Sequence, residues 1–304
     1  MCSSDLDRRR TARLRSGDQH RAIRGDEVLG GYALHVGGRD LTDAIDRAVG
    51  AAGIVERLRI LGELHGEVAE RAARFLQGRM TSRESVVDFL SLIYAGGLLE
   101  QAAGVSVFQE TSHDWRTAVA EALQLFRRSD GGYAKGPEGV ASSTYHTFLV
   151  LLCLQLVDRP IADPAAIVRF LCSQQCDEGG FREIRASKRA GTNPTAAAIA
   201  ALRILDAMTS EIREKTLDFL CEMQTDEGGL RANTRIPIAD LLSTFTGLLT
   251  LTDLDARDEI DLAHLKRFVF SLDRPEGGFH GAAWDPAHDV EYSFYGLGCA
   301  ALLG

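Results

Sequence analysis

The chain has 304 residues, 45% of them hydrophobic, which is enough for one large domain or two ordinary ones with a substantial core. A formal net charge of −9 argues against a nucleic-acid-binding protein, because binding to phosphates needs a basic face. The first residues are polar and charged without the apolar core of a signal peptide, and no window offers about 18 uninterrupted apolar residues, so we predict a cytoplasmic chain with no transmembrane segment.

The N-terminal part of the chain stands apart from the rest. Residues 1–40 match no repeat, and we expect an extension that is either disordered or a misassigned start, followed by a single domain over residues 41–304. Within that domain, a first amphipathic segment carries the letters FLQ at Phe75. The letters TSRE at residues 81–84 form a capping box and predict the start of an apolar helix, SVVDFLSLIYAGGLL.

The remaining chain is an internal array. A Gly-Gly pair begins at residues 131, 179, 228 and 277, so it recurs every 48 or 49 residues. Phe170, Phe219 and Phe268 each stand nine residues before a pair, and the segment at Phe75 is a weaker copy of the same unit. A period of this length predicts stacked units of two helices each.

Each unit contains two different helical segments. The segment before the glycines, for example SEIREKTLDFLCEMQ at residues 210–224, has apolar residues at helical spacing and predicts a helix with one wet face. We expect the Gly pair to end this helix as its C-cap. The second segment, for example DLLSTFTGLLTL at residues 240–251, is apolar or small nearly all round and predicts a buried helix.

The buried helices are expected to start at the same aligned position in every unit, which we call a column. The predicted N-cap residues are Ser143, Asn193, Asp240 and Asp289, with Pro194 at the first position of the second helix. We therefore predict an all-α fold, an α/α toroid of helical hairpins. Each hairpin would consist of an outer helix with a solvent-exposed face, a turn and a buried inner helix, repeated about every 49 residues. The mouth of the toroid would be lined by the loops and the first turns of the inner helices, and we expect the chemistry there.

The repeat resembles a known family. The pattern Phe-Leu-x-x-x-Gln-x-Asp-Glu-Gly-Gly-Phe, followed by Asp-x-x-x-Ser/Thr-x-x-Gly-Leu, is similar to the repeats of protein prenyltransferase β subunits and of the related squalene and terpenoid cyclases. The similarity covers about residues 65–304. It implies an α/α toroid, an isoprenoid diphosphate or another apolar small molecule as ligand, and a separate helical partner subunit.

The family's zinc site is only partly matched. Prenyltransferases of this family hold a catalytic zinc with Asp-x-Cys and a His on the last inner helix, because zinc turns an acceptor cysteine into a thiolate. The resemblance places the Asp on Asp240, but it places the Cys on Leu242 and the His on Tyr292. Asp240 is alternatively an N-cap. A relocated zinc would need other residues near the mouth, such as Glu291, His288, Asp289 and His146.

Cyclisation by the family's other routes is not expected. Class II cyclases protonate their substrate with Asp-x-Asp-Asp, and class I enzymes hold magnesium with Asp-Asp-x-x-Asp. No Asp-Asp dipeptide occurs in the chain.

A basic loop is the candidate for binding a diphosphate. The segment FREIRASKRAGTNP concentrates cations in an otherwise acidic chain, and guanidinium groups suit phosphate because they donate paired hydrogen bonds. The alternative is a solvated loop. The candidate substrate-binding cations are Arg182, Arg185, Lys188 and Arg235, with Arg189 and Arg231 nearby in the sequence.

Aromatic residues near the same mouth are candidates for the walls of an isoprenoid pocket or for core packing. They include Tyr133, Phe181, Phe245, Phe279, Trp284, Phe294 and Tyr295. Tyr145 and His146 are the most specific candidates for catalysis among these residues. A histidine in the first turn of a buried helix is either a core residue or a general acid or base that faces the cavity.

Three classes of function remain open at this point. The first is a prenyltransferase-like enzyme in which His146, Tyr145, Asp240, Glu291 and Tyr292 are candidate catalytic residues. The second is a non-catalytic toroid that binds a lipid or a partner protein. The third is a glycosidase with Asp240 and Glu291 as paired carboxylates. No cofactor is firmly expected, and a toroid fold alone does not choose among the three.

Overall fold

The computed structural model describes residues 65–78, 85–108 and 114–304. By its contacts the chain divides into two units, residues 1–30 and 31–304, and all described residues belong to the second. The predicted extension over residues 1–40 and the capping box at residues 81–84 lie outside the described residues. The apolar helix after that box begins at Val86, and its N-cap is Ser85, whose hydroxyl oxygen accepts from the Asp88 N–H at 3.3 Å.

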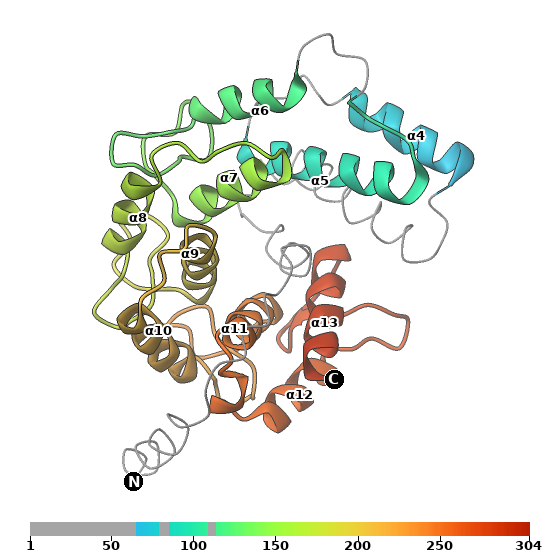
Figure 1. Ribbon diagram of the computed structural model, residues 1–304. Coiled ribbons are helices and arrows are strands. Elements are labelled where there is room, and N and C mark those ends of the chain that lie inside the picture. Colours follow the sequence, from blue (N-terminus) through green and yellow to red (C-terminus); the bar gives the residue numbers. More distant parts are fainter. Residues whose placement is uncertain (1–64, 79–84, 109–113) are drawn as a thin grey trace. The chain divides into compact units, whose positions relative to one another are not determined.

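The described helices alternate between an outer and an inner layer (Figure 1). Each inner helix contacts the next inner helix along the chain, from α5 through α7, α9 and α11 to α13. The outer helices are α4 (Gly66–Gln77), α6 (Trp115–Gln124), α8 (Pro164–Ser173), α10 (Ser210–Glu222) and α12 (Leu262–Ser271). The inner helices are α5 (Val86–Ala103), α7 (Thr144–Leu156), α9 (Thr192–Ile204), α11 (Leu241–Asp253) and α13 (Val290–Leu303).

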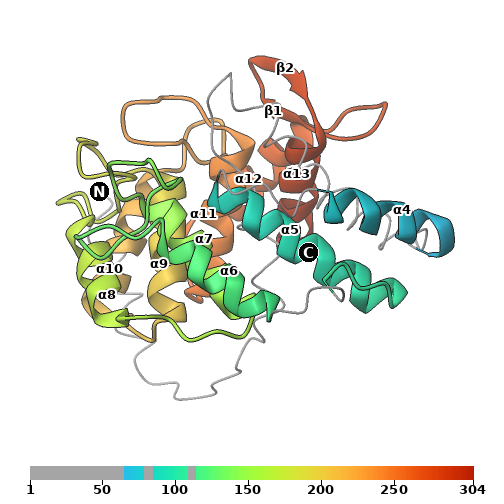
Figure 2. The same ribbon diagram turned by 90° about the horizontal axis from the view of Figure 1, so that it is seen from above.

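The short elements lie near the end of the chain. A 3-10 turn, η1 (Arg257–Glu259), precedes α12, and a two-stranded antiparallel hairpin of β1 (His280–Ala282) and β2 (Asp285–His288) leads into α13 (Figure 2). In the hairpin, His280 pairs with His288 and Ala282 with Asp285, with an irregularity between them. Strand β1 contacts both α11 and α13.

Burial follows the predicted division between wet and dry helices, with one exception. In α7 and α11 ten of the thirteen residues are buried, whereas α8 buries three of ten, Ile167, Phe170 and Leu171. Helix α13, although inner, buries only Tyr295, Gly296 and Cys299, and Leu297 is 64% exposed. The prediction of an inner helix buried on all sides is therefore wrong for α13.

Helix α5 is long and apolar enough to cross a membrane, with a mean hydropathy of 1.3 over its 18 residues, but 56% of that window is buried inside the structure. A core helix of this length passes the same test. The expected absence of a transmembrane segment stays a prediction.

The Gly pairs do not cap the outer helices, contrary to expectation. Helix α10, for example, ends with Met223 as an αR C-cap, several residues before the pair. The first glycine of each pair instead lies in a tight turn at positive φ, where its N–H donates to the carbonyl three residues earlier, as Gly228 does to Thr225 at 2.9 Å. The glycines thus belong to the turn between the layers.

The same glycines make room for the next unit. A Cβ at Gly228 would lie 2.5 Å from the His264 carbonyl oxygen of α12, and a Cβ at Gly229 would lie 2.4 Å from the ring of Phe268. Gly179 and Gly180 meet Lys215 and Phe219 of α10 in the same way. Helices α8, α10 and α12 therefore each pack a phenylalanine ring on the glycine turn of the preceding unit.

A buried threonine ties each turn to its inner helix. The Thr195 hydroxyl accepts from the Phe181 N–H at 2.8 Å and donates to the Gly191 carbonyl at 2.7 Å, and Thr147 and Thr244 make the equivalent pairs of bonds in their units. All three threonines are fully buried. These bonds satisfy backbone groups that would otherwise be buried without partners.

The predicted start of one inner helix, α9, is wrong. The N-cap of α9 is Gly191, which makes no side-chain cap, so Asn193 is not the cap and Pro194 is not at the first position. Gly191 lies in the same extended pairing with Phe181 that Ser143 makes with Tyr133, and this pairing sets the start of the helix. The predicted N-caps Ser143, Asp240 and Asp289 are confirmed.

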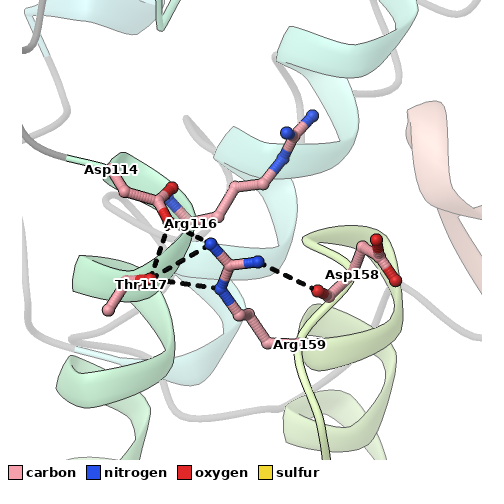
Figure 3. A network of polar contacts seen from close by, with 5 residues as sticks. All are labelled: Asp114, Arg116, Thr117, Asp158 and Arg159. Atoms are coloured by element: carbon pink, nitrogen blue, oxygen red, sulfur yellow. Dashed lines mark hydrogen bonds and ion pairs between the residues drawn. The ribbon is translucent and has the colours of Figure 1, made fainter.

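A polar network joins the start of α6 to the end of α7 (Figure 3). Arg159, just after α7, pairs with the Asp114 carboxylate and donates from Nε to the Thr117 hydroxyl at 3.2 Å. Thr117 also donates to Asp114 at 2.7 Å, and this bond, together with Arg159, lowers the pKa of the Asp114 carboxyl. The network fastens an outer helix to the inner helix of its own unit.

We expect Gly228→Ala to lower the free energy of unfolding by about 2–4 kcal/mol, because the new Cβ meets a backbone carbonyl and the residue keeps a positive φ. Gly97→Ala is the matched control: Gly97 lies within α5, and a Cβ there meets nothing within 4 Å. That control should raise stability by about 0.5–1 kcal/mol. Urea unfolding measures both variants, and equal effects would contradict a packing role for Gly228.

Candidate functional site

The first turns of the inner helices lie against the loop that precedes the next inner helix. The Thr144 N–H donates to the Glu183 carbonyl at 2.8 Å, and the Thr192 N–H donates to the Ala232 carbonyl at 2.9 Å. The Val86 N–H makes the same kind of bond to Lys135 at 3.2 Å. The predicted mouth residues of neighbouring units are therefore brought close to one another by backbone bonds.

Corresponding positions in the four complete units carry very different side chains. The N-cap column holds Ser143, Gly191, Asp240 and Asp289. The column two residues later holds Tyr145, Asn193, Leu242 and Glu291, and the next holds His146, Pro194, Ser243 and Tyr292. Because the backbone bonds repeat while these side chains do not, the side chains are not required by the architecture.

His146 is buried, with 3% of its surface exposed, although it lies in the first turn of α7. Its Nδ1 lies 2.7 Å from the Ser143 hydroxyl, whereas its Nε2 has no hydrogen-bond partner among the described residues. Burial, followed by the positive charge of Lys135, lowers the pKa of His146 to about 4. The side chain is therefore a neutral imidazole near pH 7.

Two residues that the sequence analysis did not assign to the functional site, Ser143 and Glu183, complete this arrangement. Ser143, predicted only as an N-cap, also donates its hydroxyl proton to the Glu183 carboxylate in a short hydrogen bond. Burial raises the pKa of Glu183, while its bonds from the Ser143 hydroxyl and the Tyr145 backbone oppose that change. The sequence did contain one signal: the aligned position one unit later is Ala232, so Glu183 places a carboxylate where the next unit has none. Ala232 still makes the same backbone bond.

Aromatic rings surround this part of the site. The ring of Tyr145 meets that of His146 edge-on, with centroids 5.6 Å apart. Tyr295 of α13 is 1% exposed, and its hydroxyl has no hydrogen-bond partner among the described residues. Burial, and then the nearby Glu291 and Tyr145, raise the pKa of Tyr295. Tyr295 packs against Phe245 and Phe294, with centroids 5.6 and 5.8 Å away.

The candidate zinc residues come near one another but do not form a metal site. Asp240 caps α11: one carboxylate oxygen accepts from the Ser243 N–H at 2.7 Å and the other from the Ser243 hydroxyl at 2.8 Å. Tyr292 lies near enough for carboxylates, among them Asp240 and Glu291, to add to the effect of burial in raising its pKa. Within the described parts of the chain, no three His, Cys, Asp or Glu side chains gather as metal ligands, and Leu242 and Tyr292 offer zinc no thiolate or imidazole. The residues therefore do not fit the family's zinc.

The basic candidates divide into two groups. The guanidinium group of Arg182 is used inside the fold, where it donates to the Ser173 carbonyl at the end of α8 at 2.9 Å. Arg185, Lys188 and Arg235 are exposed. Arg189 joins their two loops, since it pairs with Glu178 at 3.3 Å and donates to the Thr234 hydroxyl at 3.2 Å.

The remaining aromatic candidate lies away from the buried rings. Trp284 is 62% exposed, at the turn between β1 and β2. Its assignment to a substrate pocket stays a prediction.

Comparison with known proteins identifies the fold. The family model of the prenyltransferase alpha-alpha toroid domain matches residues 71–304. Protein geranylgeranyltransferase-I of Candida albicans, solved with geranylgeranyl diphosphate, is similar in structure with a TM-score of 0.70 and 13% identity, over 94% of this chain and 92% of that one. The predicted α/α toroid is confirmed.

A second group of similar structures consists of terpene cyclases. The type II terpene cyclase MstE from Scytonema, with its product merosterolic acid A, has a TM-score of 0.55 and 14% identity, over 83% of this chain and 85% of that one. The same cyclase without ligand has a TM-score of 0.56 and 13% identity, over 85% and 86%. A sequence search of curated proteins found no match.

We expect the imidazole of His146 to titrate near pH 4, well below the ordinary value of about 6.5. Between these values the unfolded chain binds a proton that the folded chain does not, so His146 lowers stability as pH falls from 6.5 toward 4. NMR titration of histidine-labelled protein measures the midpoint, and His146→Gln assigns the signal. A midpoint above pH 6 would contradict the buried, neutral imidazole.

Proposed function

Because the chain belongs to the prenyltransferase alpha-alpha toroid family, we propose that it binds an isoprenoid diphosphate at the first turns of its inner helices and transfers the prenyl group without zinc. The observation that carries the proposal is that two of the seven buried polar atoms without a partner among the described residues, His146 Nε2 and Tyr295 Oη, belong to inner helices. Buried polar atoms normally have partners, so this pair indicates that a bound molecule supplies them.

The surroundings of these two atoms suit an isoprenoid chain. The rings of Tyr145, Phe245, Phe294 and Tyr295 supply apolar, aromatic surface beside the two polar atoms. A ligand that is mostly apolar and carries one polar reacting end matches this combination. The similar solved structures hold geranylgeranyl compounds, which makes a geranylgeranyl chain the first ligand to test.

The diphosphate has a candidate site in the neighbouring loops. Lys188 and Arg235 come from the loops before α9 and α11, which Arg189 links through Thr234. These exposed cations, together with Arg185 of the first loop, are therefore our candidate for diphosphate binding.

Prenyl transfer at this site would differ from the zinc-assisted reaction. The bond between C1 and the diphosphate oxygen breaks, the diphosphate leaves with the electron pair, and an acceptor atom bonds to C1. His146 Nε2 takes the proton that the acceptor loses. A neutral imidazole held among aromatic rings can do this without generating a thiolate first. A helical partner subunit stays a prediction.

We expect the protein to bind geranylgeranyl diphosphate one to one in native mass spectrometry, with no zinc required. Arg185→Ala combined with Arg235→Ala should weaken the affinity at least about tenfold, because charge-assisted bonds to phosphate are lost. Arg169→Ala is the matched control, since Arg169 is exposed on outer helix α8 and belongs to neither loop.

Two outcomes would contradict this assignment. Unchanged affinity in the double variant would remove the basic loops from the site. No binding of geranylgeranyl diphosphate by the wild-type chain would overturn the isoprenoid proposal and favour the alternative of a non-catalytic toroid that binds another lipid or a partner protein. The use of both Asp240 oxygens as a helix cap is the observation that supports this alternative.

A further inference from the structure

We propose that Glu183 and Ser143 are positioning residues that hold His146 with its proton on Nδ1, so that its buried Nε2 presents a lone pair to the ligand. The inference rests on the proposed function only in naming the isoprenoid site as the place where the lone pair acts. Its evidence is a set of hydrogen bonds within the chain itself.

Counting protons at the Ser143 hydroxyl gives the direction of the bonds. The Ser143 oxygen accepts from the His146 backbone N–H at 3.0 Å, and its single proton goes to the Glu183 carboxylate. The remaining contact, 2.7 Å to His146 Nδ1, is a hydrogen bond only if Nδ1 carries a proton. Nε2 is then the unprotonated nitrogen of the neutral ring.

Glu183 is held as an acceptor. It receives the Ser143 proton and a second bond from the Tyr145 backbone N–H; burial, the larger effect, raises the pKa of Glu183, and these two bonds oppose that change. Because the Ser143 hydroxyl donates its one proton to Glu183, the Ser143 oxygen can only accept from His146 Nδ1. The chain of bonds runs from Glu183 through Ser143 to His146 Nδ1.

The repeat shows that these side chains are not needed for folding. At the positions equivalent to Glu183, Lys135 and Ala232 use their carbonyls for the same bond to the preceding inner helix without a carboxylate. At the Ser143 column, Gly191 starts α9 without a side-chain cap. Glu183 and Ser143 are thus additions to a backbone arrangement that the chain builds without them elsewhere.

The arrangement specifies what kind of group meets Nε2. A lone pair in a buried site requires a hydrogen-bond donor or a group that loses a proton there. When a proton is transferred, an N–H bond forms at Nε2, the bond from the acceptor atom to hydrogen breaks, and its electron pair stays on the acceptor atom. The resulting imidazolium donates from Nδ1 toward Ser143 and the Glu183 charge, which stabilises it.

The test is the tautomer of His146 in the full chain without any ligand, read by long-range proton–nitrogen correlation of histidine labelled with nitrogen-15. His146→Gln identifies the signal among the eight histidines. The wild-type signal should show the Nδ1–H tautomer. Ser143→Gly and Glu183→Ala, each of which introduces the residue that the chain uses one unit later, should shift the population toward Nε2–H.

Two further variants separate positioning from folding. Glu183→Gln keeps a carbonyl oxygen that accepts from Ser143 and should retain the Nδ1–H tautomer. Asp240→Gly removes the equivalent cap from α11 and should leave the His146 signal unchanged. An Nε2–H tautomer in the wild-type chain, or an unchanged tautomer in both Ser143→Gly and Glu183→Ala, would overturn the proposal.

The result is independent of whether the ligand is an isoprenoid. If geranylgeranyl diphosphate fails to bind but the tautomer behaves as expected, the proposed function fails and the positioning role stands. If the ligand binds and the tautomer is Nε2–H, isoprenoid binding stands, while the positioning role and the assignment of His146 Nε2 as the proton acceptor both fail. With both intact, Glu183→Ala should leave the affinity for geranylgeranyl diphosphate unchanged and lower the rate of diphosphate release at least about tenfold.

Discussion

The buried threonine in the first turn of the inner helices is the constraint on which the site depends. Thr147, Thr195 and Thr244 each accept an N–H from the preceding turn and donate to the N-cap carbonyl, so α7, α9 and α11 each start at a fixed distance from their turn. A polar backbone group in this position has no water to bind. With the start fixed, the side chains two and three residues after the N-cap occupy equivalent places in each unit and are free to differ.

That freedom explains how one repeated scaffold can hold unlike chemistry. The backbone bonds recur from unit to unit, whereas the same column presents His146, Pro194, Ser243 and Tyr292. Where the family's zinc ligands are expected, this chain has Leu242 and Tyr292, whereas the buried imidazole nitrogen without a partner among the described residues belongs to an earlier unit, at His146. The position of the candidate site in the array therefore depends on which unit carries the histidine.

The sequence alone was sufficient for the two-layer toroid, because glycine spacing and helical periodicity are local patterns that the fold uses directly. It misplaced the cap of α9, since Asn193 is the better N-cap residue by type while Gly191 is selected by pairing with Phe181, a contact outside the helix. It found His146 but not Glu183, which lies 37 residues later and meets Ser143 only after the loop folds back. The role of the glycines as C-caps was wrong for the same reason, because their neighbours belong to the next unit.

The glycine contacts also define how the array can be divided. A sequence repeat runs from outer helix to inner helix, but the tightly packed unit consists of a turn, its inner helix and the following outer helix, as Gly228 and Gly229 with α12 illustrate. Gly277 differs, because a Cβ there would meet nothing within 4 Å, and only its backbone conformation favours glycine. Recombination between related toroids should therefore disrupt packing when the junction separates a glycine turn from the outer helix that packs on it, as a junction between α11 and α12 would.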